Sequence, residues 1–115
     1  DVAVKEEAAT MARKLVDLEM NLVELRLTGG GQDGVRFGSK LISKIGYLAN
    51  GVATGDFRPT NQHLEVKQLL ADQLRNQLRG LDLLMTGDLS TLNDHLRSKN
   101  LPVIVDKGAA PRLTP

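Results

Sequence analysis

The two histidines, His63 and His95, are the side chains whose chemistry can be tested most directly by spacing. A carboxylate-bridged dimetal site in a helical bundle needs a Glu-x-x-His pair on each of two helices. The residues three positions before the histidines are Thr60 and Leu92, so that motif is absent, as is His-Glu-x-x-His. We therefore interpret both histidines as surface or rim residues, and we expect no metal ion and no cofactor.

A glycine-rich stretch at residues 28–34, Thr-Gly-Gly-Gly-Gln-Asp-Gly, invites comparison with a phosphate-binding loop. Such a loop follows a strand and ends in Gly-Lys-Ser/Thr. Here a predicted helix precedes the stretch, and Gly38-Ser39-Lys40 follows in the wrong order. We interpret it as a connection between helices. The alternative is that backbone amides at the start of the next helix hold an anion.

The loops contain the side chains most suited to contacting a partner. Asp33 and Arg36 either pair with each other and order the loop, or Arg36 faces a partner domain. Phe57, in the next connection, is expected to fold back as a hydrophobic anchor. The candidate interaction residues are Gln32, Asp33, Arg36, Phe37, Asp56 and Phe57.

The remaining carboxylates do not suggest an active site. They belong to mixed-charge helical faces, which are typical of solvated surface. No segment resembles the strand–turn–helix of a nucleophile elbow. We therefore predict that this chain is not an enzyme. The carboxylates considered are Glu6, Glu7, Glu19, Glu24 and Glu65.

Composition favours one helical domain. The chain has 115 residues, of which 41% are hydrophobic, and leucines far outnumber aromatic residues. Leucine loses little rotamer freedom in a helix, whereas aromatic and β-branched residues lose more. The formal net charge of +1 argues against a nucleic-acid binder. No apolar run approaches the roughly 20 residues that span a bilayer. Because the chain begins at Asp1, we expect a processed product or a piece of something longer.

Apolar spacing predicts the first helix, at residues 4–27. Its apolar residues recur alternately every four and three positions, which is an a/d pattern. Val16 and Val23 widen the stripe, as expected for a helix that packs against two others. The a/d residues are Val4, Ala8, Met11, Leu15, Leu18, Leu22 and Leu25.

The same spacing predicts further helices at residues 39–52 and 61–85, with Ser39 and Thr60 as N-caps. Asn50-Gly51 is the expected end of the earlier helix. Gly46 weakens that helix or lets another helix approach closely.

Residues 86–88 are expected to interrupt the third helix, so that Asp88 caps a short fourth helix. Asn100-Leu101-Pro102 should end that helix, and residues 103–105 should lie extended against the bundle. The predicted fold is all-α: an antiparallel bundle of three main helices, antiparallel where consecutive, plus a short fourth helix and an extended C-terminal tail. Residues 1–106 form the domain, and residues 107–115 are a flexible tail or linker.

Four segments carry a resemblance to a known family. They are residues 27–36 (LTGGGQDGVR), 40–48 (KLISKIGYL), 55–62 (GDFRPTNQ) and 92–102. They resemble the C-terminal region of bacterial proteins with BNR/Asp-box repeats in a sortilin-like β-propeller, which are commonly labelled as candidate glycosyl hydrolases. The resemblance covers roughly residues 15–105. The family commonly has an aromatic-Pro pair after the arginine, where this chain has Phe37-Gly38.

The resemblance implies that the chain is the helical C-terminal region of a larger exported protein, periplasmic or extracellular. The sequence contains no Asp-box, so the resemblance transfers no catalytic residue. The leading hypothesis is a non-catalytic accessory domain that packs against the parent propeller or another protein. One alternative is a homo-oligomer formed through surplus leucines such as Leu64, Leu69 and Leu83. Another is a domain that binds a small ligand or carbohydrate through the glycine-rich loop.

Overall fold

The chain is helical throughout its regular structure. The computed structural model describes residues 1–27 and 29–106, with the backbone alone at positions 33 and 34. Over these residues every regular element is a helix and none is a strand, which confirms the all-α prediction. The elements are α1 (Val2–Leu22), α2 (Asp33–Arg36), α3 (Leu41–Ala53), α4 (Asn61–Leu83), the π-helical turn η1 (Leu84–Asp88) and α5 (Leu89–Ser98).

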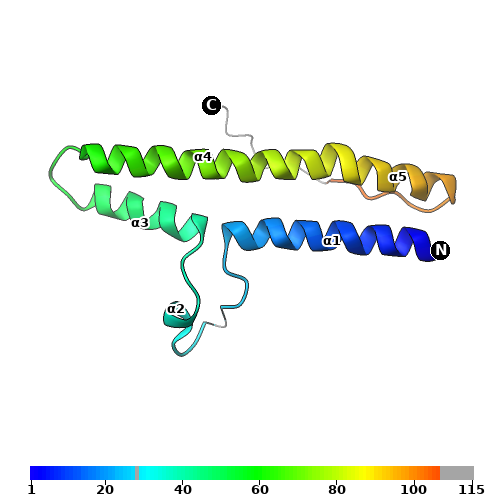
Figure 1. Ribbon diagram of the computed structural model, residues 1–115, viewed down its shortest axis with the longest axis horizontal. Coiled ribbons are helices and arrows are strands. Elements are labelled where there is room, and N and C mark those ends of the chain that lie inside the picture. The colour runs from blue at the N-terminus through cyan, green and yellow to red at the C-terminus, as the bar shows by residue number, and fades with distance from the viewer. Residues whose placement is uncertain (28, 107–115) are drawn as a thin grey trace.

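One long helix organises the molecule. The elements α4, η1 and α5 join without a break over residues 61–98, and α1 and α3 lie end to end along this helix (Figure 1). At 1.5 Å per residue the joined helix is about 57 Å long, while α1 and α3 are about 31 and 20 Å long. The two shorter helices therefore fit in line. They run in the same direction, so the expectation that consecutive helices are antiparallel holds for α3 and α4 but not for α1 and α3.

The first helix is capped at its N-terminus. It ends before the last residues of its apolar pattern. The Asp1 carboxylate accepts a hydrogen bond from the Ala3 amide at 2.9 Å. Val23 adopts an extended conformation, with φ −135° and ψ 150°, so α1 ends at Leu22 rather than near Leu27. The Glu24 carboxylate accepts a hydrogen bond from the Arg26 amide, which stabilises the turn that follows.

Two predicted features of α3 are wrong. Lys40, not Ser39, occupies the N-cap position, and it makes no side-chain cap hydrogen bond. Asn50 and Gly51 lie within the helix, which continues to Ala53. The half-buried Val52 lies in this last turn of the helix. The suggested close approach at Gly46 is also absent, because a Cβ atom there would have nothing within 4 Å.

The start of α4 agrees with the sequence. The Thr60 hydroxyl accepts a hydrogen bond from the His63 amide at 3.1 Å, and His63 Nδ1 accepts one from the Thr60 amide at 3.2 Å. This reciprocal pair satisfies two backbone donors that the helix itself leaves unpaired. The interior of α4 also meets α1 closely, since a Cβ atom on Gly80 would lie 3.4 Å from Leu18 Cδ1.

The expected interruption at residues 86–88 is a π-helical turn, not a loop, so α5 continues the long helix and is not a separate short helix. The stripe through Leu74, Leu81 and Leu84 would continue in a regular α-helix to positions 88, 91 and 95, which are polar. The apolar residues stand one position later, at Leu89, Leu92 and Leu96. One π turn absorbs one extra residue, so both stripes face α1.

Asp88 accordingly does not cap a helix with its side chain. Its carboxylate lies 2.6 Å from the Lys14 ammonium of α1, so it joins the long helix to the first helix instead.

The predicted end of the long helix is confirmed. Asn100 has φ 56°, and the amides of Asn100 and Leu101 donate to the carbonyls of Arg97 and Leu96, at 3.0 and 2.9 Å. This is a Schellman arrangement. The Asn93 amide group then binds both backbone groups of Ile104, at 2.8 and 2.9 Å, and holds the extended segment against α5. The predicted tail at residues 107–115 lies outside the described residues.

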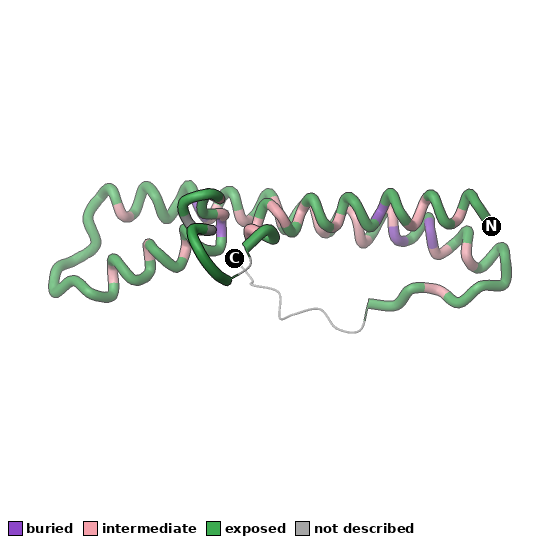
Figure 2. Tube along the Cα trace, turned by 90° about the horizontal axis from the view of Figure 1, so that it is seen from below, coloured by how far each residue is buried: buried purple, intermediate pink, exposed green. Residues whose placement is uncertain are grey.

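The packing leaves a small core and a large surface. Met11, Leu89 and Leu92 form the buried cluster between α1 and α5. Leu41 and Leu70, on α3 and α4, are the other buried hydrophobic residues of the described chain. The molecule measures 61 × 38 × 20 Å, and Figure 2 shows how few positions are buried. The wide stripe of α1 therefore lacks a full second neighbour, and Val16 is 50% exposed.

Candidate docking groove

Four of the six candidate residues lie in the glycine-rich connection between α1 and α3. Contacts between residues close in sequence hold this connection together. The carbonyl of Gln32 accepts hydrogen bonds from the amides of Val35 and Arg36, both at 3.0 Å, at the single turn of α2. Arg26 stacks on the Phe37 ring, with 4.3 Å between the guanidinium carbon and the ring centroid. Of Asp33 only the backbone is described, so the proposed pairing with Arg36 is not tested.

An ion pair fixes Arg26 in this position. Its guanidinium donates two hydrogen bonds to the Glu24 carboxylate, at 2.7 and 2.9 Å. Only 3% of the Glu24 side chain is exposed. The hydrogen bonds from Arg26 lower the pKa of Glu24 from 4.5 to about 2, although desolvation opposes this effect. The loop is thus ordered by Glu24 and Arg26. The prediction that Glu24 belongs to a solvated helical face is wrong, because it lies beyond the end of α1 and its side chain is covered.

Asp56 and Phe57 lie elsewhere, in the connection between α3 and α4 at one end of the molecule (Figure 1). Both are exposed, and Phe57 is 88% exposed, so the expectation that it folds back as an anchor is wrong. The structure does not bring this pair together with the residues around α2. The six residues therefore do not form one site.

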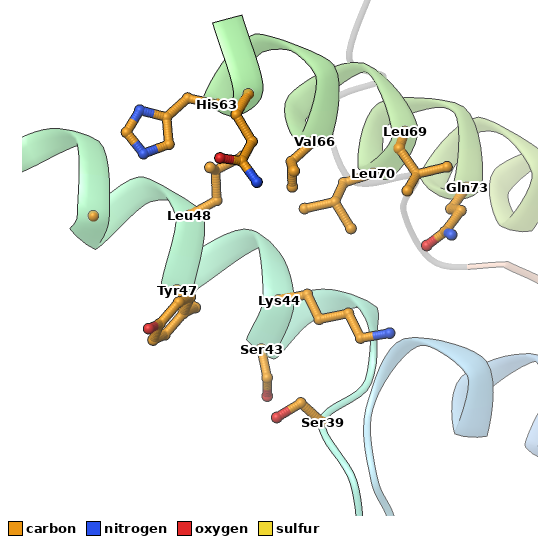
Figure 3. A pocket seen from close by; sticks show the side chains of 12 residues that line it. Ser39, Ser43, Lys44, Tyr47, Leu48, His63, Val66, Leu69, Leu70 and Gln73 are labelled. Carbon is orange, nitrogen blue, oxygen red and sulfur yellow. The ribbon is translucent and has the colours of Figure 1, made fainter. Parts of the chain in front are cut away.

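The described residues form an open groove between α3 and α4, with a volume of about 710 Å³. Leu48 on α3 faces Val66 and Leu70 on α4, and these side chains make an apolar floor (Figure 3). Polar side chains surround that floor. The rim includes Ser39, Ser43, Lys44, Gln62 and Gln73.

Helical spacing explains why these residues share the groove. Ser43 and Tyr47 are four residues apart, which places them on neighbouring turns of one side of α3, and Ser39 lies just before the helix begins. On α4 the groove residues are Gln62, Val66, Leu69 and Gln73, whose spacing also follows one helical side. Part of this face is recognisable from the sequence, because Leu69 is an apolar residue surplus to the main stripe of α4.

The groove lining is poorly suited to acid–base chemistry. It contains no carboxylate, and Nδ1 of its one histidine, His63, accepts the Thr60 amide in the cap of α4. Lys44 is the only other titratable cation of the lining, and Tyr47 is 85% exposed. The groove therefore combines an apolar floor with a polar rim that contains one lysine and no carboxylate.

A second, polar hollow of about 320 Å³ lies between α1 and the long helix. Its charged groups have partners within the fold. Lys14 pairs with Asp88 at 2.6 Å, and Glu7 approaches His95 Nδ1 at 2.6 Å. We interpret these contacts as links between α1 and α5.

Over the part of the chain that the structure describes, no group of three or more His, Asp or Glu side chains could hold a metal ion. In the same residues, no helix combines the length and apolarity needed to cross a bilayer. Comparisons with protein-family models, with curated proteins and with solved structures gave no match to this chain.

Proposed function

We propose that this chain is a non-catalytic interaction module that docks onto a protein surface through the α3–α4 groove. The observation that carries the proposal is the groove itself: an apolar floor, a largely uncharged rim and the protruding Tyr47. Protein interfaces are depleted of charge at their centre and enriched in tyrosine. The groove lining contains a lysine and a histidine but no carboxylate, so no acid–base pair lies in the groove.

Exposed hydrophobic side chains support the same proposal. Ile42, Tyr47 and Leu69 are 51%, 85% and 56% exposed. Surface of this kind marks an interaction site.

The partner proposed from the sequence is the β-propeller of a longer exported parent, with a separate protein as the alternative. This part of the proposal rests on the resemblance alone. Use of the glycine-rich loop as a ligand site has less support, because the groove lining includes neither Gln32 nor Arg36.

Photo-crosslinking from position 47 in the full-length protein tests the proposal. A photoreactive phenylalanine analogue replaces Tyr47, and the same analogue at Val2, which is 73% exposed on α1, serves as the matched control. We expect protein crosslinks from position 47 and few from position 2. The proposal is wrong if position 47 yields no protein adduct while labelling of the probe itself is complete.

Self-association is a second candidate, favoured by three exposed leucines of α4. Leu64, Leu69 and Leu83 are 52%, 56% and 65% exposed. Of these, only Leu69 lines the groove.

A further inference from the structure

We infer that the face of α5 around Asn93 is a binding site for an extended peptide, and that residues 102–105 occupy this site in cis. These residues, Pro-Val-Ile-Val, are the C-terminal strap, which runs back alongside α5 (Figure 1). The ligand is the main chain of an extended, apolar segment of a partner protein, and it binds where the strap is displaced. The site is separate from the α3–α4 groove, so the inference goes beyond the proposed function.

Asn93 recognises the strap through its backbone. The Asn93 Oδ1 atom accepts a hydrogen bond from the Ile104 amide at 2.8 Å, and Asn93 Nδ2 donates one to the Ile104 carbonyl at 2.9 Å. In a hydrogen-bonded pair of an antiparallel sheet, the N–H and C=O of one extended residue likewise bond to the same neighbour. The Asn93 amide group therefore takes the place of a neighbouring strand.

The amide group of Asn93 is presented by a rigid element. Asn93 follows Leu92, which is 1% exposed and belongs to the buried cluster with Met11 and Leu89. Polar groups on packed helices are held more precisely than those on loops. We therefore expect Asn93 to keep its position when the strap leaves.

The strap itself is weakly held. Of its four residues only Val103 is half-buried, while Ile104 and Val105 are 50% and 68% exposed. Within the described part of the chain, the backbone groups of Val103 and Val105 make no hydrogen bond. Segments with few buried apolar contacts and solvent-exposed hydrogen bonds open most readily. The strap can therefore exchange with another segment of the same chemistry.

The contacts also define that chemistry. Both bonds from Asn93 reach main-chain groups, so they do not depend on the side chain at the position of Ile104. Proline is excluded there, because it has no N–H to donate. The half-burial of Val103 favours an apolar residue one position earlier. Extended β-branched segments such as Val-Ile-Val meet these requirements.

An NMR titration of the whole chain with a synthetic peptide tests the inference. The peptide Leu-Pro-Val-Ile-Val-Asp copies residues 101–106. The Ile104→Pro variant loses the N–H that Asn93 binds, so its site should be vacated. We expect the peptide to shift the α5 amides of this variant saturably. Its apparent affinity should exceed that for the parent chain by about tenfold or more, since a tethered strap competes at a millimolar effective concentration.

Matched controls show what is recognised. Ile104→Ala keeps the N–H, so it should stay close to the parent chain. A peptide with proline in place of isoleucine should not bind to Ile104→Pro. Adding Asn93→Ala to Ile104→Pro should abolish binding of the original peptide, whereas adding Asn76→Ala, at an exposed asparagine of α4, should not. Circular dichroism verifies that each variant keeps its helices.

Hydrogen exchange in the unaltered chain tests the strap independently. The Ile104 amide should exchange more slowly than the amides of Val103 and Val105, because Asn93 alone protects it. Asn93→Ala should remove that difference.

The inference is wrong if the α5 amides of Ile104→Pro are the same with and without millimolar peptide. Binding that persists after Asn93→Ala would also overturn it, because the peptide would then lie elsewhere. Neither result affects crosslinking from position 47, so failure of this inference and failure of the proposed function are distinguishable.

Discussion

The connection between α1 and α3 depends on three side chains, Glu24, Arg26 and Phe37. The pKa of Glu24 is about 2 in the folded chain, against 4.5 without these contacts. A lowered folded pKa means that the ionised carboxylate stabilises the fold above the unfolded value. This contribution is lost as the pH falls from about 4.5 towards 2.

Arg26→Met removes the guanidinium and keeps an apolar side chain beside Phe37. We expect the pKa of Glu24 to rise towards 4.5, because the largest cause of its lowering is the hydrogen bonding from Arg26. A side-chain carboxyl titration followed by NMR measures the change. Arg13→Met, on the exposed side of α1, should leave Glu24 unchanged. A Glu24 pKa that stays near 2 in Arg26→Met would contradict this account.

Asn100 carries the turn that ends the long helix, and its φ of 56° sets the outcome of substitution. Asn100→Ala should lower the free energy of unfolding by about 1–2 kcal/mol, since a Cβ without a local hydrogen-bonding group is disfavoured there. Asn100→Gly should be close to neutral, because glycine adopts this conformation freely. Urea denaturation of the two variants compares them directly. Equal losses for alanine and glycine would show that the conformation of Asn100 is not the cause.

At the scale of elements, the π turn η1 is the feature that joins two helices into one. It corrects a one-residue offset between the stripe of α4 and the stripe of α5. Deletion of Gly87 should therefore let the segment become a regular α-helix while Leu89 and Leu92 still face α1. We expect a free energy of unfolding equal to or above that of the parent chain, measured by urea denaturation.

Deletion of Ala71 is the matched control, since that half-buried residue lies in the regular part of α4. Its loss rotates the rest of the long helix by about 100° and turns the stripe away from α1. This variant should be strongly destabilised or unfolded. If both deletions destabilise the chain equally, η1 does not serve to correct the offset.

The sequence predicted the apolar stripes well, and it predicted their ends less well. Thr60 and Asn100 could be recognised as helix ends because each acts locally: the Thr60 hydroxyl accepts from the His63 amide, and Asn100 adopts the positive φ that asparagine tolerates. The junction at residues 86–88 could not, since threonine, glycine and aspartate suit both a loop and a π turn. The choice depends on α1, whose buried face needs both stripes at once.

The groove was accessible to sequence reasoning only in part. Leu69 was identified as surplus apolar surface, but Tyr47 and Val66 were not assigned to the same face. Whether these residues meet depends on how α3 is rotated about its axis relative to α4. Packing between the helices determines that rotation, and residue spacing along one helix does not. The six loop residues were grouped by type, and the 13-residue α3 separates them into two places.

At the scale of the whole molecule, the long helix is covered by two partners of unequal strength. Along α5, α1 contributes the cluster of Met11, Leu89 and Leu92. Three contacts, Lys14–Asp88, Glu7–His95 and Asp1–Lys99, add to it at 2.6, 2.6 and 2.8 Å. Along the first half of α4, the buried residues are Leu41 of α3 and Leu70 of α4 alone among the described hydrophobic residues there.

This asymmetry predicts local opening. Amides of α3 should exchange with solvent faster than those around Met11 in α1, because fewer buried apolar contacts oppose their opening. Leu41→Ala should speed exchange in α3 and leave α1 protected. Leu92 is 1% exposed, so Leu92→Ala should lower the global free energy of unfolding by about 2–5 kcal/mol. Hydrogen exchange followed by mass spectrometry resolves the two regions.

The same measurement shows whether the two halves of the molecule open independently. Equal exchange rates in α1 and α3 would show that the two halves open together. The long helix would then transmit stability from the α1–α5 cluster to α3, and the weak packing of α3 would have no separate consequence.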